Sequence, residues 1–89
     1  MATVETVYRC RIDFNIPTED WSRTTPIERV TAYASATAQT QDVRCTWSEG
    51  GPCWNAYLTF EASSLEAVTC VVKLTERYIR RFKGAEIYE

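Results

Sequence analysis

The chain has 89 residues, of which 45% are apolar and 25% are charged. This length is enough for one domain and too short for two, and the apolar content is too high for a disordered chain. Ten basic and twelve acidic residues give a net charge of −2, so no large positive field is available to attract nucleic acid. We therefore expect residues 1–89 to form a single globular domain.

The residue types that most often carry chemistry are scarce. The chain contains no histidine, which removes the commonest general base and the commonest metal ligand. Four cysteines, Cys10, Cys45, Cys53 and Cys70, are separated by 35, 8 and 17 residues and lack the close Cys-x-x-Cys pairs of a zinc site. We therefore expect no catalytic residue, no metal and no cofactor, and a chain that is not an enzyme.

The sequence shows no pattern of a targeting segment. The N-terminus lacks the basic-then-apolar order of a secretory signal, and no apolar run approaches the roughly 18 residues that a membrane span requires. Cysteines of intracellular proteins stay reduced. We therefore expect free thiols and a cytoplasmic protein.

An alternating pattern near the N-terminus predicts the first strand. From Tyr8 to Ile16, even positions are apolar and odd positions are polar, a period typical of a half-buried strand. Thr25-Pro26-Ile27-Glu28 then indicates a helix start, with Thr25 as cap and Pro26 where its missing N–H costs nothing. The apolar residues that follow at helical spacing predict a helix ending near Thr40, with this face inward: Ile27, Val30, Ala34 and Ala38.

Two further strands form a predicted hairpin. Residues 43–48 alternate, and Gly50-Gly51 supplies a tight turn. The inward residues of the third strand are Trp54, Ala56, Leu58 and Phe60. A turn centred on the two glycines would place Trp47 opposite Trp54 on the buried face, where such an aromatic pair would hold the register.

The last third of the chain predicts a helix and a short strand. Ser63-Ser64-Leu65-Glu66 has the form of a capping box with Ser63 as the cap. The helix is expected to continue to about Lys83, where Gly84 would stop it. Residues 85–88 then form a short terminal strand.

The resulting order, β-α-β-β-α-β, favours an α+β fold of the ferredoxin-like type. This is a two-layer sandwich with a four-stranded antiparallel sheet and two helices on one face. The third strand is expected between the first and second, and the first between the third and fourth. The same architecture hosts many unrelated activities, so the fold leaves the function open.

The second helix carries more apolar surface than a two-layer fold requires. Beside the stripe expected to face the sheet (Leu65, Val68, Val72, Ile79 and Phe82) lies a second stripe at helical spacing: Ala67, Cys70, Val71, Leu74 and Tyr78. A surface helix needs an apolar arc of about 100° only. The second stripe therefore either packs against the first helix or forms a partner surface, most simply a homodimer interface.

The uncovered face of the sheet is the other candidate surface. It should display polar residues of the two central strands, and we assign a partner-binding patch to six of them: Arg9, Arg11, Asp13, Asn55, Tyr57 and Thr59. Tyr57 would anchor a partner with Arg11 beside it, because Tyr and Arg dominate interface hot spots. A solvated face of mixed charge is the alternative.

Part of this face resembles the RNA-recognition motif family. Residues 56–61 followed by 64–67 are similar to the third strand and second helix of that family, and residues 15–17 to the end of its first strand. The resemblance implies base stacking on exposed aromatics of both central strands. Tyr57 matches one such position, whereas Asn55 replaces the other, and Cys53 stands where the family has a basic residue. We interpret the resemblance as shared topology.

These observations favour a small non-catalytic protein-binding or assembly domain, in the form of a regulator or inhibitor that acts by occlusion. The partner is expected to be a protein, with a homodimer as one form and no membrane. The alternative is a nucleic-acid or small-ligand module in which Tyr57 stacks on the ligand and Arg11 meets its charge.

Overall fold

The computed structural model describes residues 6–17, 26–50 and 55–88. Its elements follow the expected order: β1 (Tyr8–Asn15), α1 (Pro26–Thr40), β2 (Arg44–Gly50), β3 (Asn55–Ala62), α2 (Leu65–Ile79) and β4 (Glu86–Tyr88). Thr25, the expected cap of α1, lies outside the described residues. The helix ends at Thr40, as the pattern predicts.

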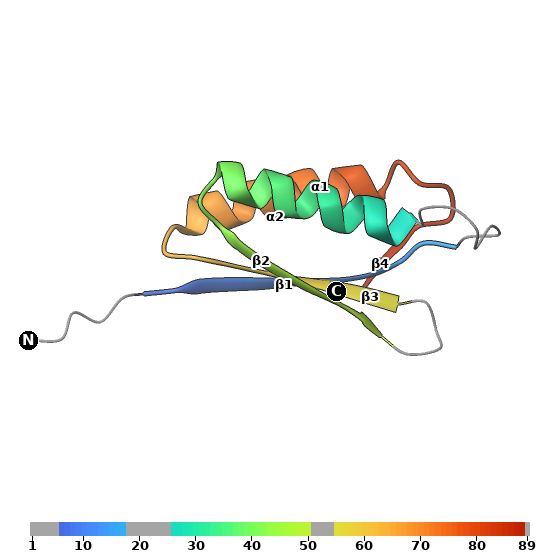
Figure 1. Cartoon of the computed structure of the whole chain (residues 1–89), viewed down its shortest axis with the longest axis horizontal. Helices are drawn as coiled ribbons and strands as arrows, with labels where there is room; N and C mark the ends of the chain where they lie inside the picture. The colour runs from blue at the N-terminus through green and yellow to red at the C-terminus, as the bar shows by residue number, and fades with distance from the viewer. Residues whose placement is uncertain (1–5, 18–25, 51–54, 89) are drawn as a thin grey trace, which may run out of the picture.

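The four strands form one antiparallel sheet in the order β2-β3-β1-β4. The third strand therefore lies between the first and second, and the first lies between the third and fourth, as expected. Both helices lie side by side on one face of this sheet (Figure 1), which leaves the opposite face uncovered by either helix. The chain is thus an α+β fold of two layers.

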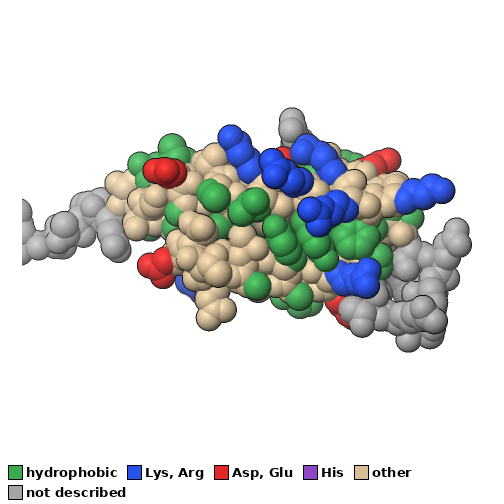
Figure 2. All heavy atoms as spheres, turned by 90° about the horizontal axis from the view of Figure 1, so that it is seen from above, with side chains coloured by type: hydrophobic (Ala, Val, Ile, Leu, Met, Phe, Trp, Pro, Cys, Tyr) green, Lys and Arg blue, Asp and Glu red, His purple; other side chains and the backbone are tan. Residues whose placement is uncertain are grey.

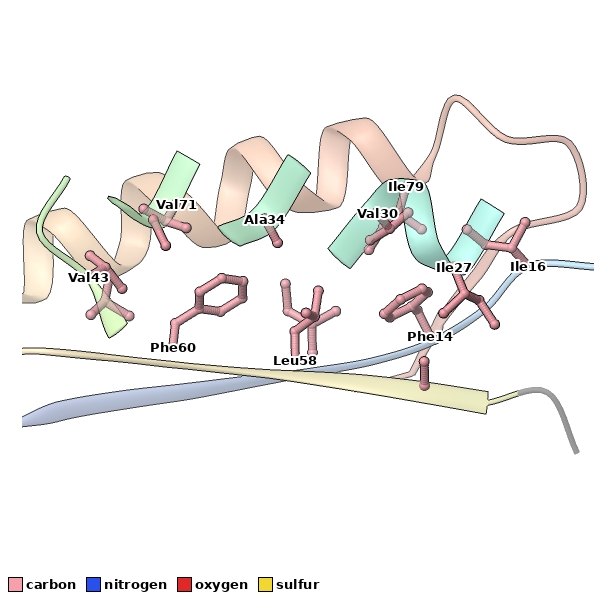
Figure 3. Close-up of a cluster of buried hydrophobic side chains, with 14 residues drawn as sticks. Phe14, Ile16, Ile27, Val30, Ala34, Val43, Leu58, Phe60, Val71 and Ile79 are labelled. Carbon is pink, nitrogen blue, oxygen red and sulfur yellow. The ribbon is translucent and has the colours of Figure 1, made fainter. Parts of the chain in front are cut away.

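The core fills the space between the sheet and the helices. Phe14, Leu58 and Phe60 project from the central strands toward the helices (Figure 3), and none of them has measurable solvent exposure. Val30 and Ala34 of α1 are equally buried. Burial of Ile12, Phe14, Ala56, Leu58 and Phe60 confirms the inward face predicted for these positions of β1 and β3, whereas Tyr8, also predicted to be inward, is 37% exposed.

The β2–β3 hairpin differs from the prediction in its register. Gly50 lies opposite Asn55, and Trp47 lies opposite Leu58, so the expected pairing of Trp47 with Trp54 is wrong. The connection between the strands is longer than the tight turn assumed, and Trp54 and Cys53 lie outside the described residues. Trp47 is 49% exposed, because β2 is an edge strand whose C-terminal half diverges from the helices (Figure 1).

Helix α2 is shorter than predicted and begins one residue later. The hydroxyl of Ser64, not Ser63, accepts a hydrogen bond from the backbone N–H of Ala67 at 3.2 Å, which is an N-cap interaction. The helix ends at Ile79, four residues before Lys83. Gly84 has φ +77° and turns the chain into β4, with Pro17 Cγ only 3.2 Å from where a Cβ would lie.

The buried stripe of α2 is also rotated relative to the prediction. Its fully or nearly buried residues are Val68, Val71, Thr75 and Ile79, whereas Leu65 is 57% exposed. Thr75 tolerates burial because its hydroxyl donates to the carbonyl of Val71 at 2.8 Å. The stripe turns because α2 packs against α1 as well as against the sheet.

None of the helices in the described segments is both long enough and apolar enough to cross a bilayer.

Candidate protein-binding surface

The uncovered sheet face is built from side chains that the strand register brings into rows. Residues directly opposite in an antiparallel pair share a face. The register therefore aligns three rows across the strands: Arg44, Glu61 and Arg9; Thr46, Thr59 and Arg11; and Ser48, Tyr57, Asp13 and Tyr88. Asn55 lies opposite Asn15, and the side chain of Asn55 is outside the described part of the chain. The remaining five residues of the predicted patch do share this face.

Arg11 and Tyr57 form the centre of the face. The guanidinium carbon of Arg11 lies 4.0 Å from the centre of the Tyr57 ring, which is a cation–π contact. Arg11 Nε also donates to Asp13 Oδ1 at 2.7 Å. The predicted proximity of Arg11 and Tyr57 is confirmed, and Asp13 fixes the arginine over the ring.

A second ion pair lies along the same face. Arg9 donates to Glu61 Oε1 through Nε at 3.1 Å and through Nη2 at 2.7 Å. This hydrogen bond, together with the charges of Arg9 and Arg44, holds the pKa of the Glu61 carboxyl below its usual value of 4.5. The carboxylate is therefore favoured in the folded protein.

The lowered pKa of Glu61 predicts a specific pH dependence of stability. Its contribution is present above pH 4.5, its usual pKa, and is lost as pH falls through the lower folded value. We expect Glu61→Gln to reduce the free energy of unfolding slightly at pH 7. The variant should also lose less of its free energy of unfolding than the wild type does as the pH is lowered. Urea unfolding between pH 3 and pH 7 (roughly the carboxyl titration range) measures this. Identical pH slopes for both proteins would contradict the assignment.

The terminal strand adds a second aromatic that the sequence did not mark as a site. Tyr88 lies opposite Asp13 and is 43% exposed. Its hydroxyl donates to Glu86 Oε2 at 2.9 Å, and this bond raises the pKa of Tyr88. Tyr88 lies near Arg11 and Tyr57 only because of the register in which the three-residue strand β4 pairs with β1. No local sequence pattern indicates that register, so the sequence did not identify Tyr88.

Charges on the face balance within the described residues. The cations, Arg9, Arg11 and Arg44, are matched by three carboxylates: Asp13, Glu61 and Glu86. Two of the arginines are directly ion-paired. Individual charged groups on this face can therefore select a partner with complementary charges, although the face as a whole has no net positive field.

The second candidate surface, the outer stripe of α2, is not continuous. Val71 is fully buried, which corrects its assignment to an outer surface. Tyr78 stacks on Tyr33 of α1, with ring centroids 4.2 Å apart and planes 4° from parallel, and meets Phe82 edge-on at 5.5 Å. Ala67 and Leu74 are half-buried and Cys70 is exposed. Much of the stripe thus packs within the chain, and the contact with α1 accounts for Tyr78.

The described cysteines are free thiols in different environments. Cys10 and Cys45 are half-buried, and Cys70 is exposed. Burial raises the pKa of the Cys45 thiol, an effect partly offset by a hydrogen bond with Ser35. Over the described ranges, no three Cys, Asp or Glu side chains lie close enough to hold a metal ion.

Comparison with known protein families, curated proteins and solved structures finds no match to this chain.

Proposed function

We propose that this chain is a small non-catalytic protein-binding domain of the ferredoxin-like type, which acts in the cytoplasm and recognises a protein through its open sheet face. Binding there would occlude the partner surface, as a regulator or inhibitor does. The observation that carries the proposal is the Arg11–Tyr57 contact at the centre of that face.

This contact supports recognition because it fixes the side-chain conformations of two residues, Arg11 and Tyr57, before a partner binds. Tyr and Arg side chains contribute a large share of binding energy at protein interfaces. Asp13 already holds Arg11 over the Tyr57 ring. Less side-chain entropy is therefore lost when a partner binds.

The electrostatics of the face support a protein partner over a nucleic acid. Nucleic-acid affinity comes largely from unpaired cations that neutralise phosphates, whereas Arg9 and Arg11 are already paired with carboxylates.

The test compares partner capture by matched variants. Wild-type chain, Arg11→Ala, Tyr57→Thr and Lys83→Ala are used as baits in lysate from the source cells, with quantitative mass spectrometry. Threonine keeps the strand propensity of position 57. We expect one protein to be retained by wild type and by Lys83→Ala and lost from the other two. With the purified partner, each loss should correspond to affinity weaker by about tenfold or more.

Two results would contradict the proposal. The captured protein could bind all four baits equally, which would place recognition elsewhere. Alternatively, the bait could retain oligonucleotides with a steep salt dependence that Tyr57→Thr abolishes, which would assign the face to a nucleic-acid module.

A further inference from the structure

The charge of the chain is distributed unevenly. Residues 73–83 contain five basic residues and one acidic residue, a net charge of +4, whereas the rest of the chain contains five basic and eleven acidic residues, a net charge of −6. The overall charge of −2 therefore conceals a strongly positive segment. Figure 2 shows lysine and arginine side chains gathered over the end of the helical layer where α2 ends.

The positive side chains of α2 lie on the side that faces away from the sheet. Val71 and Thr75 are buried, and Lys73 and Arg77 fall on the opposite side of the helix at about 100° per residue. These two cations are exposed and are one turn apart, about 6 Å along the axis. Arg81, also exposed, continues the row in the turn after the helix, where its backbone N–H donates to the carbonyl of Tyr78 at 3.2 Å.

Helix α1 adds a fourth cation to this surface. The first half of α1 lies beside the end of α2 (Figure 1), where Tyr33 stacks on Tyr78. Arg29 is exposed and precedes Tyr33 by one turn, so both residues lie on the same side of α1. A cation in the first turn of a helix is opposed by the helix macrodipole. The stability of α1 therefore does not account for Arg29.

The four cations form no ion pair with any residue in the described ranges. We call them the basic face: Arg29, Lys73, Arg77 and Arg81. Among the described residues, the arginines that do form ion pairs are Arg9, Arg11 and Arg80, the last at 3.6 Å from Glu76. The basic face therefore carries uncompensated positive charge, in contrast to the balanced charge of the open sheet face, and is complementary to an anionic partner.

The basic face offers charge but little accessible apolar surface. The large apolar side chains that are exposed in the described chain lie next to or on the strands, or at the first residue of α2: Val7, Tyr8, Trp47, Tyr88 and Leu65. Tyr33, Tyr78 and Phe82 are half-buried against one another. A helix on a membrane surface inserts an apolar face among the lipids, and a protein interface has an apolar core. Phosphate contacts alone, by contrast, are sufficient for binding to DNA, because they release condensed counterions.

We propose that the basic face binds the phosphate backbone of duplex DNA independently of base sequence. A DNA duplex presents one negative charge per about 1.7 Å of its axis, so a row of cations one helical turn apart can contact several phosphates. Arginine donates two hydrogen bonds to one phosphate. Single-strand binding instead relies on exposed rings on which bases stack, whereas Tyr33 and Tyr78 are stacked on each other.

Duplex RNA fits the basic face less well than duplex DNA. Recognition of duplex RNA depends in part on contacts with its 2′-hydroxyl groups, which both donate and accept hydrogen bonds. Lysine and arginine side chains carry donors and no acceptor, which suits phosphate oxygens. The proposed site is separate from the open sheet face, because the two lie on opposite layers of the fold (Figure 1).

The probe is a fluorescein-labelled DNA duplex of about 16 base pairs, which at about 3.4 Å per base pair is longer than the row of cations. Fluorescence anisotropy measures its binding from about 25 mM to about 200 mM KCl, the range in which phosphate contacts weaken strongly. We expect a dissociation constant of about 1–100 μM at physiological salt, and four phosphate contacts predict a slope of log K against log salt of about −3.6. A second duplex of unrelated sequence should bind equally.

Matched variants locate the phosphate contacts. Arg77→Gln and Arg81→Gln should each make the salt slope less steep by about 0.9 and weaken binding by about five- to tenfold near 100 mM salt. Arg44→Gln removes the same charge from the sheet layer and should leave the slope unchanged. All three arginines are exposed, so the substitutions leave the core intact. Tyr57→Thr should also leave duplex binding unchanged, which separates this proposal from that for the open face.

The proposal is overturned if the duplex does not bind at about 25 mM salt, where phosphate contacts are strongest, or if Arg44→Gln changes the slope as much as Arg77→Gln does. Two competitors test the other anionic partners: vesicles of phosphatidylserine and phosphatidylcholine, and a glutamate-rich peptide. Tighter binding of either one than of the duplex, lost in Arg77→Gln and Arg81→Gln, would assign the basic face to a membrane or to an acidic protein. None of these results would affect the open-face proposal, since they concern the opposite layer.

Discussion

Phe60→Ala is expected to lower the free energy of unfolding by about 3–5 kcal/mol, because truncating a buried phenylalanine removes apolar contact and leaves a cavity. Phe60 is fully buried on the central strand β3, opposite Cys10 on one side and Cys45 on the other. A chain of this size has a total stability of about 4–13 kcal/mol. The expected loss is therefore a large fraction of the total stability, and it matches the whole of it at the lower end of this range.

Urea unfolding followed by circular dichroism and tryptophan fluorescence measures this loss. Phe60→Leu keeps most of the volume and should cost less than about 1.5 kcal/mol. Leu65→Ala removes an exposed apolar side chain, 57% accessible, and should change stability by less than about 0.5 kcal/mol. Equal effects of Phe60→Ala and Leu65→Ala would show that the core does not lie between the sheet and the helices.

Tyr78→Ala is the second large effect, and it decides the role of the α2 stripe. Tyr78 stacks on Tyr33 and meets Phe82 edge-on. We expect the variant to lose about 2 kcal/mol of stability, from partial burial of the ring together with the aromatic contacts. Because these contacts lie within one chain, the loss should be independent of protein concentration.

A double-mutant cycle isolates the stack. Tyr33→Ala and Tyr78→Ala should show a coupling of about 1 kcal/mol, and Cys70→Ala, on the exposed side of α2, should show none with either. Unfolding midpoints that rise with protein concentration, together with a dimeric mass that Tyr78→Ala converts to a monomer, would instead assign Tyr78 to a homodimer interface.

The strand faces were predictable from sequence because alternation is a local property. Each step along a strand reverses the side chain, so Ile12, Phe14, Leu58 and Phe60 could all be placed inward without knowledge of their partners, and the structure buries each of them. The same alternation placed Arg11 and Tyr57 on the outer face. Because β1 and β3 were predicted to be neighbours, the contact between them could be anticipated.

Features that depend on the distance between elements were harder to predict. Gly50-Gly51 suggested a tight turn, but the register is set by how β2 pairs along β3, and Trp47 consequently lies opposite Leu58. Ser63 and Ser64 are both competent caps. The position at which α2 meets the sheet decides between them in favour of Ser64.

The sequence by itself therefore determined the element order, the inward face of each central strand and the balanced charge of the open face. All of these follow from local periodicity and composition. The tertiary structure alone decided that Val71 and Thr75 of α2 are buried while Leu65 is exposed, because the helix packs against α1 and the sheet together. It also decided that β4 covers only the last three residues of β1. The resulting free edge depends on where two distant segments meet, and no local pattern records that position.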